Sequence, residues 1–288
     1  MPKVHNILAQ LPEPESIDMG SLAGQWLRGE LDLVVVLGPT ASGKTRYAVE
    51  LAREINAMVA VGMFEGCPGR MTDECPVSGA EIISADSRQV YRGMDIGTGK
   101  DLDEYGEIPY HLIDIADAGE QYNVFRYVED FKKVYADIRS RRSVPILCGG
   151  TGMYINAVTA GYDFSSNTPL SASRAPISID GLPRSPYFIG TLVSREVRNA
   201  RIDARLDVRL KEGMVDEIRG LMERGVPVDV LLGYGLEYRF VTQYIIGELS
   251  YDQMRDKLAI AIHQFAKRQM TWFRGMERSG VKIHWTHV

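Results

Sequence analysis

The chain has 288 residues, of which 45% are hydrophobic and 25% are charged, and its net charge is −5 at pH 7. This composition is ordinary for a soluble globular protein of one or two domains, with enough residues to bury a sizeable core. The acidic balance excludes a protein that is basic throughout, so any contact with nucleic acid must come from a local patch.

Cysteine content and hydropathy bear on the compartment. The three cysteines, an odd number, do not make a disulfide framework. No apolar run approaches the length of a membrane span, and the N-terminus lacks the basic start and apolar core of a signal peptide. We therefore expect a cytoplasmic protein with no membrane contact. The sequence leaves the oligomeric state open, with a monomer as the expectation.

The first half of the chain predicts strands that alternate with helices. Residues 1–30 are expected to be a variable lead-in. The apolar run Leu33–Leu37 predicts a strand, the following helix ends near Ala57, and residues 58–79, rich in Gly, Pro and Met, predict an inserted surface loop. Further strands are expected at 81–85, 111–115 and 144–148, and further helices at 123–141 and from Met153.

The second half of the chain is expected to be more helical. Residues 163–183, rich in Ser, Pro, Ala and Gly, predict an irregular connector. A strand is expected at 187–193, helices at 196–211, 215–224 and 251–274, and a last strand at 282–285. The alternation of strands and helices favours an α/β fold with a doubly wound parallel sheet, in which ligands bind at the carboxyl ends of the strands.

Residues 38–45 read Gly-Pro-Thr-Ala-Ser-Gly-Lys-Thr, a complete phosphate-binding loop between a predicted strand and a predicted helix. Glycines let such a loop turn tightly so that its N–H groups point at phosphate oxygens, the lysine adds a positive charge, and the last threonine can hold a magnesium ion. The loop predicts binding of a polyphosphate or pyrophosphate without indicating the reaction. The residues expected to bind it are Gly38, Pro39, Thr40, Ala41, Ser42, Gly43, Lys44 and Thr45, with Thr45 on Mg²⁺.

Two further polar residues follow predicted strands and are expected at the same edge of the sheet. Asp86 follows the strand at 81–85, and Thr151 lies in the Gly-Gly-Thr-Gly turn after the strand at 144–148. Asp86 fits a proton acceptor, a magnesium ligand or a helix N-cap. Thr151 fits either a substrate contact or a turn residue. These interpretations stay open on the residues alone.

Four sequence blocks together with the loop carry a family resemblance. They are Ile-Ile-Ser-Ala-Asp-Ser-Arg-Gln-Val-Tyr and its continuation at 82–100, His-Leu-Ile-Asp at 111–114, Gly-Gly-Thr-Gly-Met-Tyr-Ile at 149–155, and Ala-Lys-Arg-Gln-Met-Thr-Trp-Phe at 266–273. From about residue 33 to the C-terminus, with two interruptions, the chain resembles the tRNA dimethylallyltransferase (isopentenyltransferase) family. The resemblance implies a P-loop-type catalytic domain, residues 31–162 and 184–288, with a helical C-terminal part. It implies transfer of a dimethylallyl group from dimethylallyl diphosphate to N6 of an adenosine beside the tRNA anticodon, with release of pyrophosphate.

The resemblance also implies roles for particular residues. Asp86 matches the family's base, which fits the chemistry because the lone pair of the adenine amine is delocalised and a nearby carboxylate can take its proton. Thr151 matches a contact to the target adenosine, and Arg201 and Arg205 match an Arg-Ile-x-x-Arg pattern that reaches the diphosphate. Arg205 is expected to be catalytic with Asp86 and Thr151. The residues expected near tRNA are Asp86, Ser87, Arg88, Gln89, Thr151, Lys267, Arg268 and Gln269.

The chain departs from the family pattern in one respect that bears on the acceptor. Family members usually carry a helical insertion that grips the anticodon stem-loop, and here the 163–183 connector stands in its place. Relatives that prenylate free adenine nucleotides (AMP, ADP or ATP) also lack the insertion, so a free-nucleotide prenyltransferase stays possible. The blocks at 86–91 and 266–269 are closer to the tRNA enzymes and favour tRNA.

Two hypotheses outside prenyl transfer also stay open on the sequence. A P-loop small-molecule kinase would need a second acidic magnesium ligand, for which Asp114 is the candidate. The second hypothesis is a protein that keeps the fold without the activity.

Overall fold

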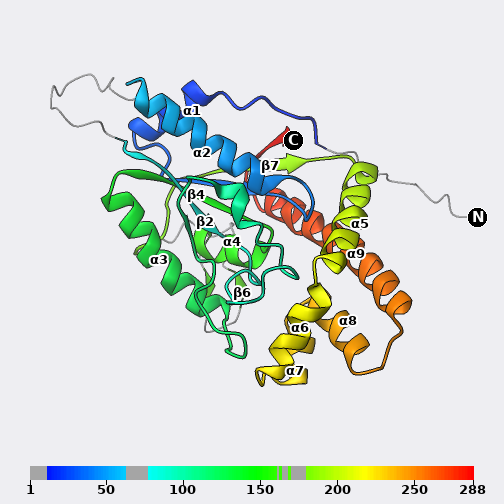
Figure 1. Ribbon diagram of the computed structural model, residues 1–288. Coiled ribbons are helices and arrows are strands. Elements are labelled where there is room, and N and C mark those ends of the chain that lie inside the picture. The colour runs from blue at the N-terminus through cyan, green and yellow to red at the C-terminus, as the bar shows by residue number, and fades with distance from the viewer. Residues whose placement is uncertain (1–11, 63–76, 161, 164–167, 170–179) are drawn as a thin grey trace, which may run out of the picture.

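The computed structural model describes residues 12–62, 77–160, 162–163, 168–169 and 180–288. A six-stranded parallel sheet with strand order β3-β2-β4-β1-β7-β8 forms its centre (Figure 1). The strands are β1 (Leu33–Leu37), β2 (Gly79–Ser84), β3 (Tyr110–His111), β4 (Ser143–Gly149), β7 (Pro186–Leu192) and β8 (Ile283–His287). A separate antiparallel pair consists of β5 (Tyr162–Asp163) and β6 (Thr168–Pro169). The expected α/β fold with a doubly wound parallel sheet is confirmed.

Helices cover both faces of this sheet. They are α1 (Met19–Leu27), α2 (Lys44–Ala60), α3 (Val124–Ser140), α4 (Gly152–Thr159), α5 (Arg195–Lys211), α6 (Met214–Glu223), α7 (Val228–Gly233), α8 (Leu236–Ile245) and α9 (Tyr251–Arg278), with a 3-10 turn η1 (Leu102–Tyr105). Every residue of β1 is buried, which is what its unbroken apolar run predicts for a strand covered on both faces. Among the described residues, no helix combines the length and the hydrophobicity needed to cross a membrane.

The two faces of β1 belong to two hydrophobic cores. Val34 and Val36 point into a core shared with α1 and α2, whereas Leu33, Val35 and Leu37 point into a core shared with α3, α4 and α9. This division follows from the period of two along a strand. The second core continues into α5, α6, α7 and α8, so the sheet and the helical C-terminal part fold as one unit.

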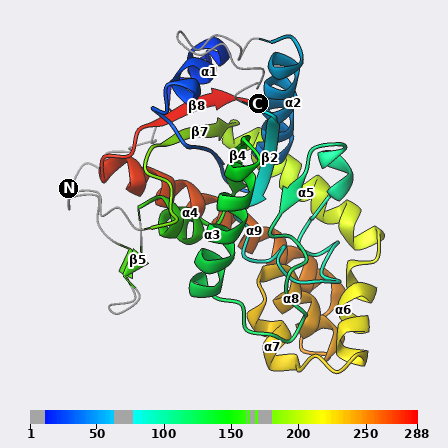
Figure 2. The ribbon, with the colours of Figure 1, turned by 90° about the vertical axis from the view of Figure 1, so that its left-hand side faces the viewer.

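Helix α9 connects the helical part to the sheet. It begins at a capping box, in which the Ser250 side chain accepts from the Gln253 backbone and the Gln253 side chain accepts from the Ser250 backbone. Its 28 residues bring Phe273 and Met276 into the core beneath the sheet. Figure 2 shows α6, α7 and α8 gathered at the end of the molecule opposite α1 and β8. The carboxyl edge of the sheet faces these helices, since residues that follow β2 and β4 line a cavity together with residues of α8 and α9.

Several elements differ from the sequence prediction. Part of the segment 1–30, expected as a lead-in, forms helix α1, whose Leu22 is buried against the sheet, and the Glu15 N–H donates to the Trp285 carbonyl at 2.6 Å. Helix α2 runs to Ala60, three residues past its expected end. Strand β3 has two residues rather than the five expected at 111–115, and α7 and α8 were not predicted. Most of the predicted loop at 58–79 and most of the connector at 163–183 lie outside the described residues.

Candidate active site

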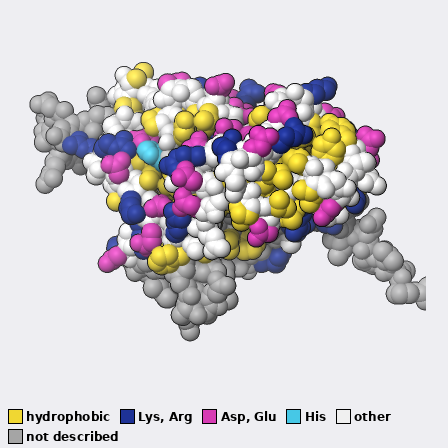
Figure 3. Space-filling view, turned by 60° about the horizontal axis from the view of Figure 1, so that its bottom comes forward, with side chains coloured by type: hydrophobic (Ala, Val, Ile, Leu, Met, Phe, Trp, Pro, Cys, Tyr) yellow, Lys and Arg dark blue, Asp and Glu magenta, His cyan; other side chains and the backbone are white. Residues whose placement is uncertain are grey.

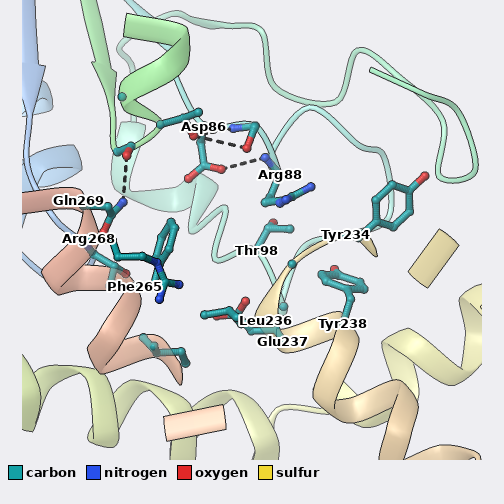
Figure 4. Close-up of a pocket in the computed structure, with 18 of the residues that line it drawn as sticks. Asp86, Arg88, Thr98, Tyr234, Leu236, Glu237, Tyr238, Phe265, Arg268 and Gln269 are labelled. Carbon is teal, nitrogen blue, oxygen red and sulfur yellow. Dashed lines mark hydrogen bonds between the residues drawn. The ribbon is translucent and has the colours of Figure 1, made fainter. Parts of the chain in front are cut away.

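Two cavities meet at the carboxyl edge of the sheet. The first, of about 190 Å³, lies beside the phosphate-binding loop and is called here the loop cavity. The second, of about 510 Å³, lies between that edge and helices α8 and α9 and is called the wide cavity (Figure 4). Thr40, Asp86, Thr98 and Arg205 line both cavities. These four residues form what is called here the shared wall. A group bound in one cavity can reach a group bound in the other at this wall.

The phosphate-binding loop is shaped by contacts that only glycine permits. A Cβ atom on Gly38 would lie 2.2 Å from the Thr191 hydroxyl and 2.5 Å from the Ser42 hydroxyl, and these two hydroxyls are themselves buried and 2.6 Å apart. Gly43, directly before helix α2, has a φ of +84°, in the left-handed region that glycine tolerates best. The loop therefore turns directly from β1 into the N-terminus of α2, which favours an anion there.

Lys44 and Thr45 both line the loop cavity, as expected from the motif. Burial lowers the pKa of Lys44, although the nearby Asp86 carboxylate counteracts this effect. The Cys148 thiol donates to the Lys44 carbonyl at 3.7 Å, and burial raises the pKa of that thiol to about 12, so it stays protonated at neutral pH. A diphosphate bound in this cavity would give the buried Lys44 ammonium an anionic partner, and this partner favours the charged form of the lysine.

Asp86 is held in place by a pair of neighbouring turns. Its Oδ1 accepts a hydrogen bond from the Arg88 N–H at 2.9 Å, and the Ser87 N–H donates to the Thr151 hydroxyl at 3.1 Å. Thr151 N–H donates in turn to the Ala85 carbonyl at 3.1 Å. The second carboxylate oxygen, Oδ2, has no hydrogen-bond partner among the described residues, so it is available to accept a proton from a substrate.

The arginines of α5 divide between the site and the surface. Arg205 donates to the Thr40 hydroxyl at 2.6 Å, and burial, assisted by the charge of Arg209, lowers the pKa of Arg205 to about 10. Arg209 is buried and pairs with Asp101 at 3.1 Å. Arg201 is exposed and lines neither cavity, but one of its terminal nitrogens lies 3.9 Å from the position that a Cβ on Gly43 would take. Arg205 is thus the arginine at the shared wall, and Arg201 lies just outside the loop.

The mouth of the wide cavity combines aromatic and cationic side chains. Phe265 and Trp272 are each 39% exposed although they lie on the core-forming helix α9, and the Arg268 guanidinium lies 5.7 Å from the centre of the Phe265 ring. The Trp272 indole packs on Gly152, where an added Cβ would lie 2.2 Å from the ring. The combination of aromatic rings and a guanidinium at this mouth suits unstacked bases and phosphates of single-stranded RNA. Figure 3 shows one face of the molecule, on which hydrophobic side chains lie among both basic and acidic ones.

Comparison with known proteins places this site in a family. The model of the IPP transferase family matches residues 89–181 and 165–276. The tRNA dimethylallyltransferase 1 of Azobacteroides pseudotrichonymphae is 44% identical over 310 residues, which cover 90% of this chain and 94% of that protein. The chain belongs to this family. The tRNA dimethylallyltransferase 1 of Parabacteroides distasonis is also 44% identical, over 88% of this chain and 92% of that protein.

Solved structures agree with this assignment. The full-length tRNA isopentenylpyrophosphate transferase from Bacillus halodurans superposes with a TM-score of 0.69 at 29% identity, covering 89% of each chain. The tRNA delta(2)-isopentenylpyrophosphate transferase from Staphylococcus epidermidis gives a TM-score of 0.68 at 27% identity, covering 88% of this chain and 92% of that one. The family resemblance drawn from the sequence blocks is therefore confirmed.

The remaining residues predicted for tRNA have different surroundings. Ser87 and Arg88 line the wide cavity. Lys267 is exposed and lines neither cavity. Gln89 lines the loop cavity, where its amide donates to the Gly99 carbonyl at 3.1 Å and accepts from the Ser84 hydroxyl at 3.2 Å. Gln269 is buried and lines the wide cavity.

Further residues of the site were not identified from the sequence. Glu217 of α6 accepts hydrogen bonds from the N–H groups of Asp95, Ile96 and Gly97 at 2.7–3.1 Å, and so holds the segment that carries Thr98 into both cavities. No sequence signal indicates this, because Glu217 is about 120 residues from its partners and lies on an ordinary amphipathic helix.

Asp114, the candidate magnesium ligand of a kinase, is paired with the buried Lys100. The Lys100 ammonium is buried, donates to the Tyr91 carbonyl at 2.7 Å, and forms ion pairs with Asp95 and Asp114. Asp114 lines neither cavity. The candidate for the second magnesium ligand of a kinase is therefore already paired with a lysine and lies outside both cavities.

The residues of the loop cavity fit a magnesium ion that is held mainly by a substrate. The Thr45 hydroxyl and the carboxylates of Asp86, Asp101 and Glu104 line this cavity. Burial raises the pKa of Glu104, and a cation nearby would oppose this effect. Within the described ranges, no three His, Cys, Asp or Glu side chains lie close enough together to hold a metal by themselves. Mg²⁺ typically combines one or two protein oxygens with water and substrate phosphates, which agrees with this arrangement.

Proposed function

We propose that this chain transfers a dimethylallyl group from dimethylallyl diphosphate to N6 of an adenosine next to the anticodon in tRNA, and releases pyrophosphate. The observation that carries the proposal is the position of Asp86 on the wall between the two cavities. The diphosphate of the donor occupies the loop cavity, and the adenine enters from the wide cavity. The relatives named tRNA dimethylallyltransferase support the same donor and acceptor.

The reaction replaces one bond with another at a single carbon. The adenine N6 forms a bond to C1 of the prenyl group while the bond from C1 to the diphosphate oxygen breaks, and the electron pair leaves with pyrophosphate. Asp86 takes the proton that N6 loses, through the carboxylate oxygen that has no partner among the described residues. Thr151, which anchors the Asp86 turn through Ser87, lies where it can orient the adenine.

The charge that develops on the leaving group meets several cationic groups. Lys44, Arg205 and the N–H groups of the loop at the start of α2 stabilise the departing pyrophosphate. Thr45 would hold Mg²⁺ together with the diphosphate, and the ion would supply further positive charge to the leaving group. Arg201, whose guanidinium lies beside Gly43, is proposed as a further contact to the diphosphate.

The acceptor is proposed to be tRNA rather than a free nucleotide. An adenine in an anticodon loop lies in single-stranded RNA and can be unstacked into a pocket. Phe265 and Trp272 offer stacking surfaces at the mouth, and Arg88 and Arg268 offer cations to the backbone. Exposed Lys267 lies beside the mouth on α9 and is proposed as a further phosphate contact.

The helical insertion of the family is proposed to be absent from this chain. The alignment with the Azobacteroides relative spans 310 positions, more than the 288 residues of this chain, so that relative contains segments without a counterpart here. The two matches to the family model overlap at residues 165–181, inside the connector at 163–183. Both observations support a shortened connector in place of the insertion. A tRNA substrate also agrees with the expected cytoplasmic location.

The test is to incubate the protein with dimethylallyl diphosphate, Mg²⁺ and unmodified tRNA, and to measure prenylated adenosine by mass spectrometry of the digested RNA. An anticodon stem-loop then competes with AMP at equal concentration across a salt series. We expect the stem-loop to be preferred, with a preference that falls as salt rises, because phosphate contacts release counterions. Preferential prenylation of AMP that does not change with salt contradicts the tRNA assignment.

A further inference from the structure

The Gln269 side chain joins the two loops that meet at the shared wall. Its Oε1 accepts a hydrogen bond from the Thr40 N–H at 2.8 Å, and its Nε2 donates to the Gly150 carbonyl at 3.0 Å. Thr40 belongs to the phosphate-binding loop after β1, and Gly150 belongs to the turn after β4. Because an N–H group only donates and a carbonyl only accepts, the two partners fix the orientation of the amide. Gln269 is therefore a bridge between the donor loop and the acceptor turn.

The residues around the Gln269 side chain pack closely against it. Gln269 is only 8% exposed, and a Cβ on Gly150 would lie 2.4 Å from its Nε2, so the turn comes this close only because residue 150 is glycine. Thr40 is held a second time, through its hydroxyl, by Arg205 of α5. Two helices of the C-terminal part thus fix the position of one residue of the phosphate-binding loop.

The bridge continues directly to Asp86. Gly150 precedes Thr151, whose hydroxyl accepts from the N–H of Ser87, the residue next to Asp86. Figure 4 shows Gln269 reaching from α9 toward this side of the cavity, with its hydrogen bond drawn. One buried amide therefore sets how the loop that holds the diphosphate lies relative to the turn that holds the base.

We infer that Gln269 is a positioning residue that aligns the prenyl carbon of the donor with N6 of the adenine and touches neither of them. This inference rests on the proposed function, and it replaces the tRNA contact expected for Gln269 with a role inside the protein. When N6 bonds to C1 and C1 separates from the diphosphate oxygen, the two groups must lie in line. A misplacement of about 1 Å can cost about 10²-fold in rate. The effect of losing the bridge therefore falls on the rate with both substrates bound.

The first experiment removes both hydrogen bonds and keeps the volume. Gln269→Met is compared with Gln264→Met, which makes the same change at an exposed position of α9 that lines neither cavity. We expect the single-turnover rate with saturating dimethylallyl diphosphate and stem-loop to fall about 10²-fold in Gln269→Met. The Kd of each substrate should change by less than about threefold, because neither substrate loses a contact. Gln264→Met should react like the unchanged protein.

Two results of this experiment overturn the inference. One is a single-turnover rate for Gln269→Met within about threefold of the unchanged protein. The other is a normal rate at saturation together with a raised Kd for the stem-loop, which would make Gln269 an RNA contact.

The second experiment uses Gln269→Glu and pH, and it keeps the test valid if Gln269→Met folds poorly. An ionised carboxylate at this position accepts from Thr40 N–H but repels the Gly150 carbonyl, whereas the protonated carboxyl restores both hydrogen bonds. The rate of the variant relative to the unchanged protein should therefore rise as the pH falls from about 8 to about 6, since burial raises a carboxyl pKa. The charged groups lining the same cavity titrate in both proteins, so a change in the ratio with pH reports the new carboxyl in these surroundings: Asp86, Arg88, Arg205, Arg209, Glu237 and Arg268. A ratio that is flat with pH contradicts the bridge.

A third measurement separates failure of this inference from failure of the proposed function. If the unchanged protein prenylates neither the stem-loop nor AMP, the proposed function is wrong. The bridge is then judged without substrates, from hydrogen exchange of the Thr40 amide. We expect exchange at least about tenfold faster in Gln269→Met than in Gln264→Met, because only the first loses the acceptor. Equal exchange in the two variants overturns the bridge.

Discussion

The Arg205 guanidinium donates a hydrogen bond to the Thr40 hydroxyl at 2.6 Å, across a separation of 165 residues in the chain. This contact places a cation from the helical C-terminal part directly on the phosphate-binding loop. Both residues also line the wide cavity, so the same guanidinium lies on the wall between the two cavities. The helical part is therefore a component of the site and not an appendage to the sheet.

Replacing Arg205 by lysine is expected to lower activity at least about tenfold at neutral pH and further at alkaline pH. Burial and Arg209 already lower the pKa of Arg205 to about 10, which leaves it fully charged at neutral pH. A lysine has a lower ordinary pKa, so the same surroundings bring its proton loss between about pH 7 and 9. The measurement is kcat against pH for Arg205→Lys, with Arg219→Lys, an exposed pair of Asp216, as the control. An unchanged kcat across this range contradicts a charged contact to the leaving group.

Replacing Asp86 by asparagine keeps the shape of the side chain and removes the proton acceptor. We expect kcat to fall by about 10²- to 10⁴-fold while the Kd of dimethylallyl diphosphate stays nearly the same. Asp117→Asn, at an exposed residue that pairs with Arg92, is the matched control. If donor affinity collapses while the rate at saturation holds, Asp86 binds the donor or its magnesium and is not the base.

Gly38→Ala tests the packing of the phosphate-binding loop. The new Cβ would lie 2.2 Å from the buried Thr191 hydroxyl, so the loop or β7 must move. We expect the free energy of unfolding to fall by about 1–3 kcal/mol in urea titrations, with a weaker affinity for pyrophosphate. Gly233→Ala is the control, because a Cβ there meets open space at the end of α7, and it should be neutral or slightly stabilising. Equal effects of the two changes would mean that the loop tolerates a side chain at residue 38.

The free energy of unfolding is expected to depend on pH through the carboxyl group of Glu81. Burial alone raises the pKa of Glu81, but hydrogen bonds from Arg141 and from His111, the latter at 2.8 Å, outweigh it and leave the pKa below its ordinary value. A carboxyl whose folded-state pKa is lowered stabilises the protein above its unfolded-state pKa of 4.5, and this contribution is lost as the pH falls through the folded-state value. Glu81→Gln should therefore lower the unfolding free energy at pH 7 by about 1–3 kcal/mol.

The difference between Glu81→Gln and the unchanged protein should shrink below about pH 4.5. Unfolding in urea at several pH values measures it, and Glu223→Gln, at an exposed position of α6, is the matched control. A difference that is constant from neutral to acid pH would show that the carboxylate charge does not contribute.

The sequence by itself determined the centre of the fold and the donor loop, because both depend on short-range patterns. The apolar run of β1 is buried at every residue, a Cβ at Gly38 would clash with Thr191, and Lys44 lines the loop cavity. The blocks around Asp86 and Thr151 follow the ends of β2 and β4, which lie side by side in the parallel sheet. These short sequence patterns therefore indicated that the candidate site lies at the carboxyl edge of the sheet.

The tertiary structure alone showed which partners the distant residues of the site bind. Gln269, Arg205 and Glu217 lie far along the chain from the loops that they bind, and their hydrogen bonds form only after α5, α6 and α9 pack against the sheet edge. Lys100 likewise removed Asp114 from consideration as a magnesium ligand, through a pairing that sequence spacing does not reveal. A periodic pattern specifies which face of an element is buried, whereas the partner of a polar side chain depends on how the elements pack in space.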